Sequence, residues 1–127
     1  MNDAVLADQV RIIQEKLRRA GWRTANAIGE LITDDGILWF TATYTHGEYT
    51  VETSYRPTGA GKAEGVARVR LTPALVQAHP RVAIDLAQDL IDLGRQVHDR
   101  KGRGNDVRRY LENGDAWPGP TWKEFAV

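Results

Sequence analysis

An alternation of apolar and polar residues between Ala25 and Tyr55 is the feature that most constrains the fold of this chain. β-branched and aromatic residues are concentrated there, and two turn sequences, Asp34-Asp35-Gly36 and His46-Gly47-Glu48, divide the stretch. A period of two residues is typical of strands with one buried and one solvent-facing side. The sequence therefore predicts three antiparallel strands, which cover residues 26–33, 37–45 and 48–56.

The alternation also predicts which side chains share a face. The inward side of the second and third strands is mostly apolar and carries Leu38, Phe40, Ala42, Tyr44, Tyr49, Val51, Thr53 and Tyr55. The outward side carries Trp39, Thr41, Thr43, Thr45, Thr50, Glu52, Ser54 and Arg56. A fourth strand is expected from Val66 to Leu71, with Arg68 and Arg70 outward. One apolar and one polar face indicate a meander sheet that helices cover on one side only.

Helical periodicity flanks this region. The expected helices cover residues 3–20, 72–79, 81–97 and 106–113. The first carries an apolar stripe from Leu6 to Leu17 and is expected to end at Gly21, and Thr72-Pro73 is a favourable start for the second. The sequence thus predicts a two-layer α+β domain with a four-stranded antiparallel meander sheet and helices packed on one face. Its order is α-β-β-β-β-α-α, in which the last two helices are the long one over 81–97 and the short one over 106–113.

Composition excludes several classes of protein. The chain has 127 residues, no cysteine, and 17 basic against 17 acidic side chains. Without cysteine there is no disulfide, no thiolate nucleophile and no Cys-ligated metal. No run approaches the roughly 18 apolar residues of a membrane span, and the first residues do not have the pattern of an export signal. We therefore expect a soluble, cytoplasmic domain over residues 1–115, followed by a C-terminal aromatic arm over residues 116–127.

Motifs for cofactor or metal binding do not match their required patterns. The loop Gly59-Ala60-Gly61-Lys62 precedes Ala63 and a strand, whereas a phosphate-binding loop continues into Ser or Thr and a helix. Its composition favours an ordinary connection between strands. The three histidines, His46, His79 and His98, have no i+3 or i+4 spacing to one another. We expect no cofactor and no metal site.

Acidic residues offer only a weak enzymatic alternative. One face of the long helix carries three aspartates, Asp85, Asp89 and Asp92, which we interpret as a solvated face rather than a cation site. Acid/base chemistry in a small hydrolase would draw on the acidic residues Glu30, Asp34, Asp35, Glu48 and Glu52. Ser54 is the one serine, and its mid-strand position is unlike that of a nucleophile in a strained turn. We expect no catalytic residues and no small-molecule substrate.

The aromatic arm is the most informative segment for function. Trp117, Trp122 and Phe125 are too many large aromatics for a disordered end, so the arm must pack on a surface. That surface belongs either to its own domain or to a partner, for which aromatic side chains are common anchors. Trp39, outward among threonines, is a further candidate contact. The candidate partner-binding residues are therefore Trp39, Trp117, Trp122 and Phe125.

These features predict a non-catalytic protein-interaction or assembly module. Its expected partner is another protein or a second copy of the chain, with a homo-oligomer favoured, as in accessory, structural or inhibitor proteins of phages and mobile elements. The alternative is a nucleic-acid-binding protein that contacts the phosphate backbone without sequence preference. Its candidate contacts are Arg18, Arg19, Arg100, Lys101, Arg103, Arg108 and Arg109. Basic residues near helix C-termini also offset the helix dipole, which explains the same clusters without a ligand.

Overall fold

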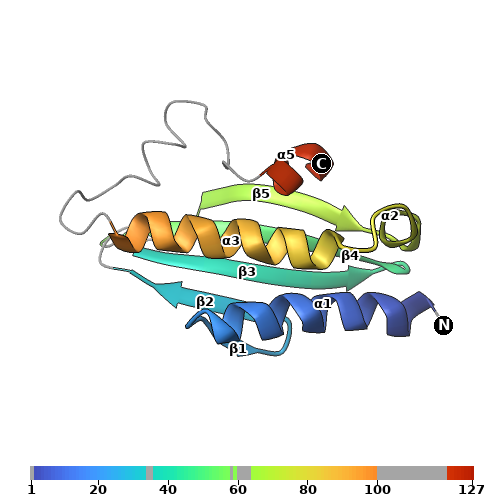
Figure 1. The fold of residues 1–127 in the computed structure, drawn as a ribbon, viewed down its shortest axis with the longest axis horizontal. Coiled ribbons are helices and arrows are strands. Elements are labelled where there is room, and N and C mark those ends of the chain that lie inside the picture. Colours follow the sequence, from blue (N-terminus) through green and yellow to red (C-terminus); the bar gives the residue numbers. More distant parts are fainter. Residues whose placement is uncertain (1, 34–35, 58, 60–63, 100–119) are drawn as a thin grey trace.

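The chain folds into an α+β structure with one antiparallel sheet, as expected (Figure 1). The computed structural model describes residues 2–33, 36–57, 59, 64–99 and 120–127. Helix α1 (Asn2–Arg19) precedes the strands β1 (Arg23–Ala25), β2 (Ile28–Ile32), β3 (Gly36–Thr45), β4 (Glu48–Pro57) and β5 (Glu64–Leu71). The helices that follow are α2 (Pro73–Ala78), α3 (Val82–Asp99) and α5 (Pro120–Phe125). The helix expected over residues 106–113 lies outside the described residues.

Within the described residues the sheet has five strands in chain order, not the four that the sequence predicted. The first predicted strand, residues 26–33, contains a tight turn and only one strand, β2. Asn26 and Ala27 both have positive φ angles, 48° and 64°, and reverse the chain between β1 and β2. Such a turn is usually marked by Asn-Gly. Because alanine takes the place of glycine here, the sequence carried no signal for the turn or for the three-residue strand before it.

The turn between β3 and β4 confirms the prediction at His46 and Gly47. Both residues have positive φ angles, 51° and 82°, as a two-residue hairpin turn requires. This turn aligns Trp39 opposite Ser54 along the β3–β4 pair. It therefore determines which outward side chains become neighbours.

The core lies between the sheet and two helices. Helices α1 and α3 lie side by side, run in the same direction and cover one face of the sheet (Figure 1). The predicted stripe of α1 is buried against the sheet. The predicted inward face is buried over most of its length, but Tyr44 at its end is 44% exposed. The buried side chains of α1, β3, β4 and α3 include Leu6, Val10, Ile13, Leu17, Leu38, Phe40, Val51, Tyr55, Leu86 and Leu90. The predicted helix start at Thr72 is also confirmed, since its side chain accepts a hydrogen bond from Leu75 N at 3.1 Å.

The end of the chain packs on its own domain. Helix α5 lies against α3 and the edge strand β5 (Figure 1). Beyond α5, Ala126 forms an antiparallel bridge with Val69, and Val127 N donates to Arg68 O at 2.9 Å. These contacts extend the sheet edge by a short piece of the C-terminal segment. The sequence left open whether the arm packs in cis or in trans, and residues 120–127 pack in cis.

Candidate interaction surface

The side of the sheet opposite α1 and α3 is called the outer face below. Antiparallel pairing places directly opposite residues on the same face, so the register assigns its side chains. The large apolar residues of the outer face are Ile28, Ile32, Ile37 and Trp39, and its charged residues include Arg23, Glu30, Glu48, Glu52, Arg56, Arg68 and Arg70. Threonines and Ser54 fill most remaining positions.

Four apolar side chains form a strip along β2 and β3. Ile28 and Ile32 are 45% and 60% exposed, and both lie on β2. Ile37 lies directly opposite Ile32, while Trp39 occupies the next outward position of β3. Single exposed apolar residues are normal on a protein surface, but adjacent ones on an uncovered sheet are typical of a contact surface. Ile28, Ile32, Ile37 and Trp39 are called the apolar strip.

Trp39 is held in one orientation by its neighbours. Its indole Nε1 donates a hydrogen bond to Glu30 Oε2 at 3.0 Å from the adjacent strand. The guanidinium carbon of Arg56 lies 5.2 Å from the centre of the Trp39 rings, on the diagonal position of β4. A cation over an indole face is attractive, and a fixed aromatic side chain loses little conformational entropy on binding. Trp39 is therefore preoriented on the outer face.

The rest of the outer face carries charges of both signs in pairs. Arg68 Nε lies 2.9 Å from Glu52 Oε1. Arg70 donates through two nitrogens to both oxygens of Glu48, at 2.8 and 2.9 Å. These hydrogen bonds hold the pKa of Glu48 below its usual range and raise that of Arg70. The face thus offers alternating charge rather than a basic field.

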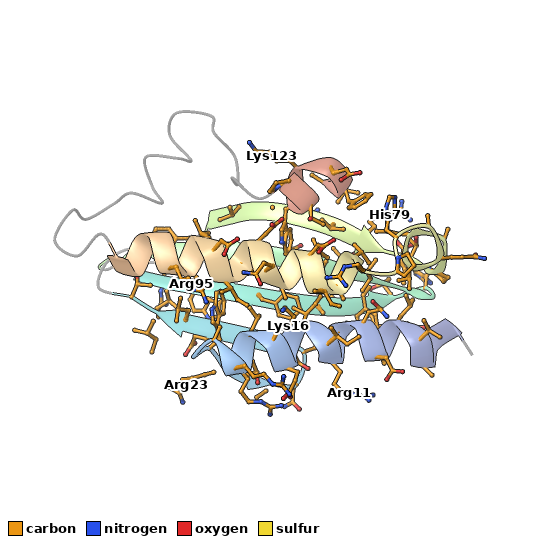
Figure 2. All side chains as sticks on the ribbon, viewed as in Figure 1. Arg11, Lys16, Arg23, His79, Arg95 and Lys123 are labelled. Atoms are coloured by element: carbon orange, nitrogen blue, oxygen red, sulfur yellow. The ribbon has the colours of Figure 1, made fainter. Side chains whose placement is uncertain are left out.

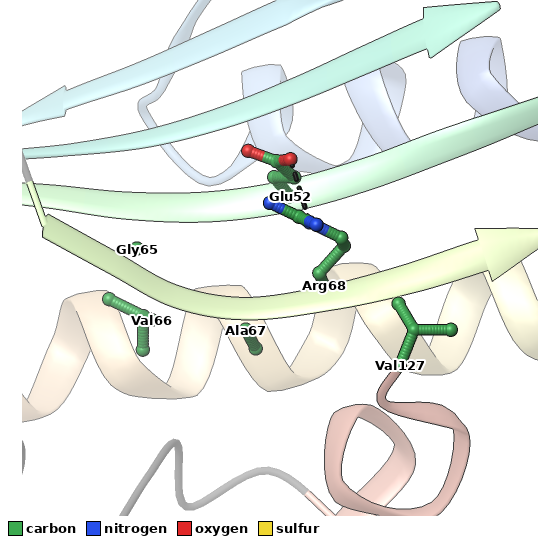
Figure 3. A pocket seen from close by; sticks show the side chains of 6 residues that line it. All are labelled: Glu52, Gly65, Val66, Ala67, Arg68 and Val127. Carbon is green, nitrogen blue, oxygen red and sulfur yellow. Dashed lines mark ion pairs between the residues drawn. The ribbon is translucent and has the colours of Figure 1, made fainter. Parts of the chain in front are cut away.

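Two shallow hollows border this face. One, of about 320 Å³, lies at the β1–β2 turn and includes Arg23, Ile28 and Glu30 in its lining. The other, of about 240 Å³, lies at the β5 edge beside Val127 (Figure 3). There the paired side chains of Glu52 and Arg68 lie on one side of β5, and Val66 and Ala67 point to the opposite side (Figure 3).

The acidic residues considered for catalysis are engaged by donors on the outer face. Glu30 accepts from Trp39, Glu48 from Arg70, and Glu52 pairs with Arg68. In the described part of the chain, no group of three or more His, Asp or Glu side chains could hold a metal ion. Asp34 and Asp35 lie outside that part.

The interpretation of the three aspartates of α3 as a solvated face is wrong for Asp89. Its Oδ2 accepts hydrogen bonds from the backbone N–H groups of Thr121, at 3.0 Å, and Trp122, at 3.4 Å. Asp89 therefore caps the first turn of α5 from the neighbouring helix, a distant contact that sequence spacing does not reveal. Partial burial raises the pKa of Asp89, and these hydrogen bonds partly offset that rise. Asp85 is exposed, and Asp92 accepts from Gln88 within α3.

The arm residues proposed as partner contacts have different positions. Trp122 is fully buried, and its Nε1 donates to Leu86 O at 2.9 Å. Its ring is part of the core of its own domain, so the expectation that Trp122 is an exposed partner contact is wrong. Phe125 is half-buried, with its ring centre 4.7 Å from that of His79. Trp117 lies outside the described residues.

The basic residues proposed as phosphate contacts are only partly described. Arg18 and Arg19 both pair with Glu15 on α1, which reduces their positive field. Arg100, Lys101, Arg103, Arg108 and Arg109 lie outside the described residues. The labelled basic side chains in Figure 2 are distributed over α1, β1, α3 and α5: Arg11, Lys16, Arg23, Arg95 and Lys123.

The sequence identified Trp39 on this surface but missed the three isoleucines and Arg56 as its neighbours. The alternation from Ile28 to Ile32 indicated that these isoleucines share a face. Because the turn before Ile28 was not recognised, the sequence did not show that this face is the outer one. No protein family, curated protein or solved structure matches this chain. None of the described helices has the length and hydropathy needed to cross a membrane.

Proposed function

We propose that this chain is a non-catalytic protein-interaction module that binds its partner through the outer face. The observation that carries the proposal is the apolar strip, whose Trp39 is preoriented, on a sheet face that α1 and α3 leave uncovered. Tryptophan and arginine are enriched among residues that dominate binding energy. Trp39 and Arg56 stack together at the border between the strip and the charged rows.

The exposed area is sufficient to contribute to binding. Complete burial of an isoleucine contributes about 1.5–3 kcal/mol relative to full exposure. Ile28 and Ile32 are 45% and 60% exposed in the free chain, so roughly half of that contribution remains available to each. Ile37 and Trp39 add smaller amounts, because they are already half-buried. A partner would add polar contacts to the paired charges around the strip.

Site-specific photocrosslinking tests the proposal in the cells that make the protein. We expect p-benzoylphenylalanine at position 32 to give one discrete adduct, because Ile32 is the most exposed member of the apolar strip. The same residue at position 11, on the exposed surface of α1, is the control and should give none. The adduct should disappear when Trp39→Ala is added. An adduct from position 11 alone would place the interaction on the helices and contradict the proposal.

Phosphate-backbone binding is the second candidate, favoured by the parallel course of α1 and α3. Both helices end toward the same end of the molecule (Figure 1), near Lys16, Arg18 and Arg19. Retention of nucleic acid should then fall steeply with salt and be lost on replacing Arg100, Lys101 and Arg103 by alanine. Equal retention by that variant would remove this candidate.

A further inference from the structure

We infer that the partner of the outer face is a second copy of this chain, packed sheet to sheet about a two-fold axis. The inference rests on the proposed function and specifies its partner. It is carried by the arrangement of charge and apolar side chains in three neighbouring rows across β2, β3 and β4.

The register defines these rows. The first row contains Ile32, Ile37 and Arg56. The central row contains Glu30, Trp39 and Ser54. The third row contains Ile28, Thr41 and Glu52. Each row follows the direction of the hydrogen bonds between strands, and successive rows lie two residues apart along each strand.

A two-fold axis along the central row relates the outer rows of two facing sheets. Rotation about such an axis turns the second sheet over, keeps each strand above its own copy and reverses the strand direction. The first row of one copy then faces the third row of the other. Sheets that pack in this aligned manner lie about 10 Å apart, with strands within about 30° of each other. Contacts made by an off-axis residue occur twice in such a dimer.

The facing rows are complementary. Ile32 faces Ile28 of the partner subunit, and Arg56 faces Glu52 of the partner subunit. In the described residues Arg56 makes no ion pair, because its guanidinium lies over Trp39. Glu52 pairs with Arg68 through Oε1, and its side chain is 36% exposed, so a second guanidinium can approach the carboxylate.

The side chains of the central row can also face the central row of a second copy. Small Ser54 on the axis leaves room beside the large Trp39. Glu30 approaches its symmetry mate, but Arg23 lies directly opposite Glu30 on β1 and supplies the compensating charge. A strongly acidic partner would meet the three glutamates of this face and a strongly basic one its four arginines, whereas a second copy carries the same mixture of both signs. Charge complementarity therefore favours a second copy.

Charge exchange between two variants tests this geometry. Arg56→Glu places two carboxylates together at both symmetric contacts, and Glu52→Arg places two guanidinium groups together there. Each variant alone should dimerise at least about tenfold more weakly than the unmodified chain. An equimolar mixture should restore the affinity to within about threefold, because the mixed dimer has an opposite charge pair at both contacts. Sedimentation velocity over a concentration series measures all three.

Arg70→Glu is the matched control. It makes the same change on the same face, in a row that lies outside the three facing rows. Its dimerisation should equal that of the unmodified chain. Circular dichroism and thermal unfolding of each variant separate loss of association from loss of folding. Dimerisation of Arg56→Glu at unchanged affinity, or a mixture as weak as its components, would overturn the inferred axis.

The crosslinking adduct at position 32 separates this inference from the proposed function. An adduct of twice the chain mass, formed by purified protein, supports both. An adduct of another mass from cells, with a monomer in sedimentation, overturns the second copy and leaves the interaction module intact. Absence of any adduct, with a monomer, overturns both.

Discussion

At the scale of single residues, Thr53 is a polar residue at an inward position of the alternating pattern, so its hydroxyl lies in the core. Thr53 lies opposite Phe40 at an inward position and is fully buried. Among the described residues its Oγ1 has no hydrogen-bond partner. A buried hydroxyl without a partner destabilises the folded state by about 1–3 kcal/mol. The site therefore favours a residue of the same shape without the hydroxyl.

Thr53→Val should raise the free energy of unfolding by about 1 kcal/mol, because valine keeps the shape and removes the unpaired group. Thr50→Val, on the outer face of the same strand, is the control and should change it by less than about 0.5 kcal/mol. Urea unfolding measures both. Destabilisation by Thr53→Val would show that the hydroxyl is satisfied in solution.

Partial burial raises the pKa of the Asp89 carboxyl. We expect carbon-13 NMR to find the pKa of Asp89 above the usual value of 3.8. Because the pKa of Asp89 is higher in the folded than in the unfolded chain, protonation of Asp89 stabilises the fold. This stabilisation is complete below pH 3.8 and is lost as the pH rises through the folded-state pKa. Asp89→Asn keeps an oxygen for Thr121 and Trp122 and should remove this pH dependence. A pKa at or below 3.8 would contradict the assignment of burial as the main cause.

At the scale of elements, helix α5 contributes to the core, whereas the sequence predicted only an aromatic arm there. Trp122 fills space against α3 with no exposed surface, and Asp89 caps the helix. The alternation of the sheet and the stripe of α1 could be predicted because each depends on residues close in sequence. The pairs Asp89–Thr121 and Trp122–Leu86 join residues more than 30 positions apart, so no local pattern could indicate them.

Trp122→Ala should therefore lower the free energy of unfolding by about 3–5 kcal/mol, the usual effect of removing a buried aromatic side chain. Phe125→Ala should have a smaller effect, because Phe125 is only half-buried. Thermal unfolding distinguishes the two. Trp122→Ala with unchanged stability and weakened association would instead place this tryptophan between subunits.

At the scale of the whole molecule, the two faces of the sheet differ in how much apolar surface they bury. The inner face determines stability, since Leu38 and Phe40 are fully buried against the helices. On the outer face Ile32 is 60% exposed, so this side chain contributes less burial to the folded state. The sequence predicted this division from the alternation, but it could not predict which outward residues would be adjacent. That depended on the β1–β2 turn and on the strand register.

Ile32→Glu and Leu38→Ala should separate association from stability on neighbouring strands. Ile32→Glu adds a charge where solvent already reaches, so the free energy of unfolding should change by less than about 1 kcal/mol. Its carboxylate would have to lose water on contact with a partner, so association through the outer face should be lost. Leu38→Ala leaves a cavity in the core and should lower the free energy of unfolding by about 2–5 kcal/mol. Urea unfolding and sedimentation velocity measure stability and association for both variants. If Ile32→Glu unfolded the chain or left association unchanged, this division would be contradicted.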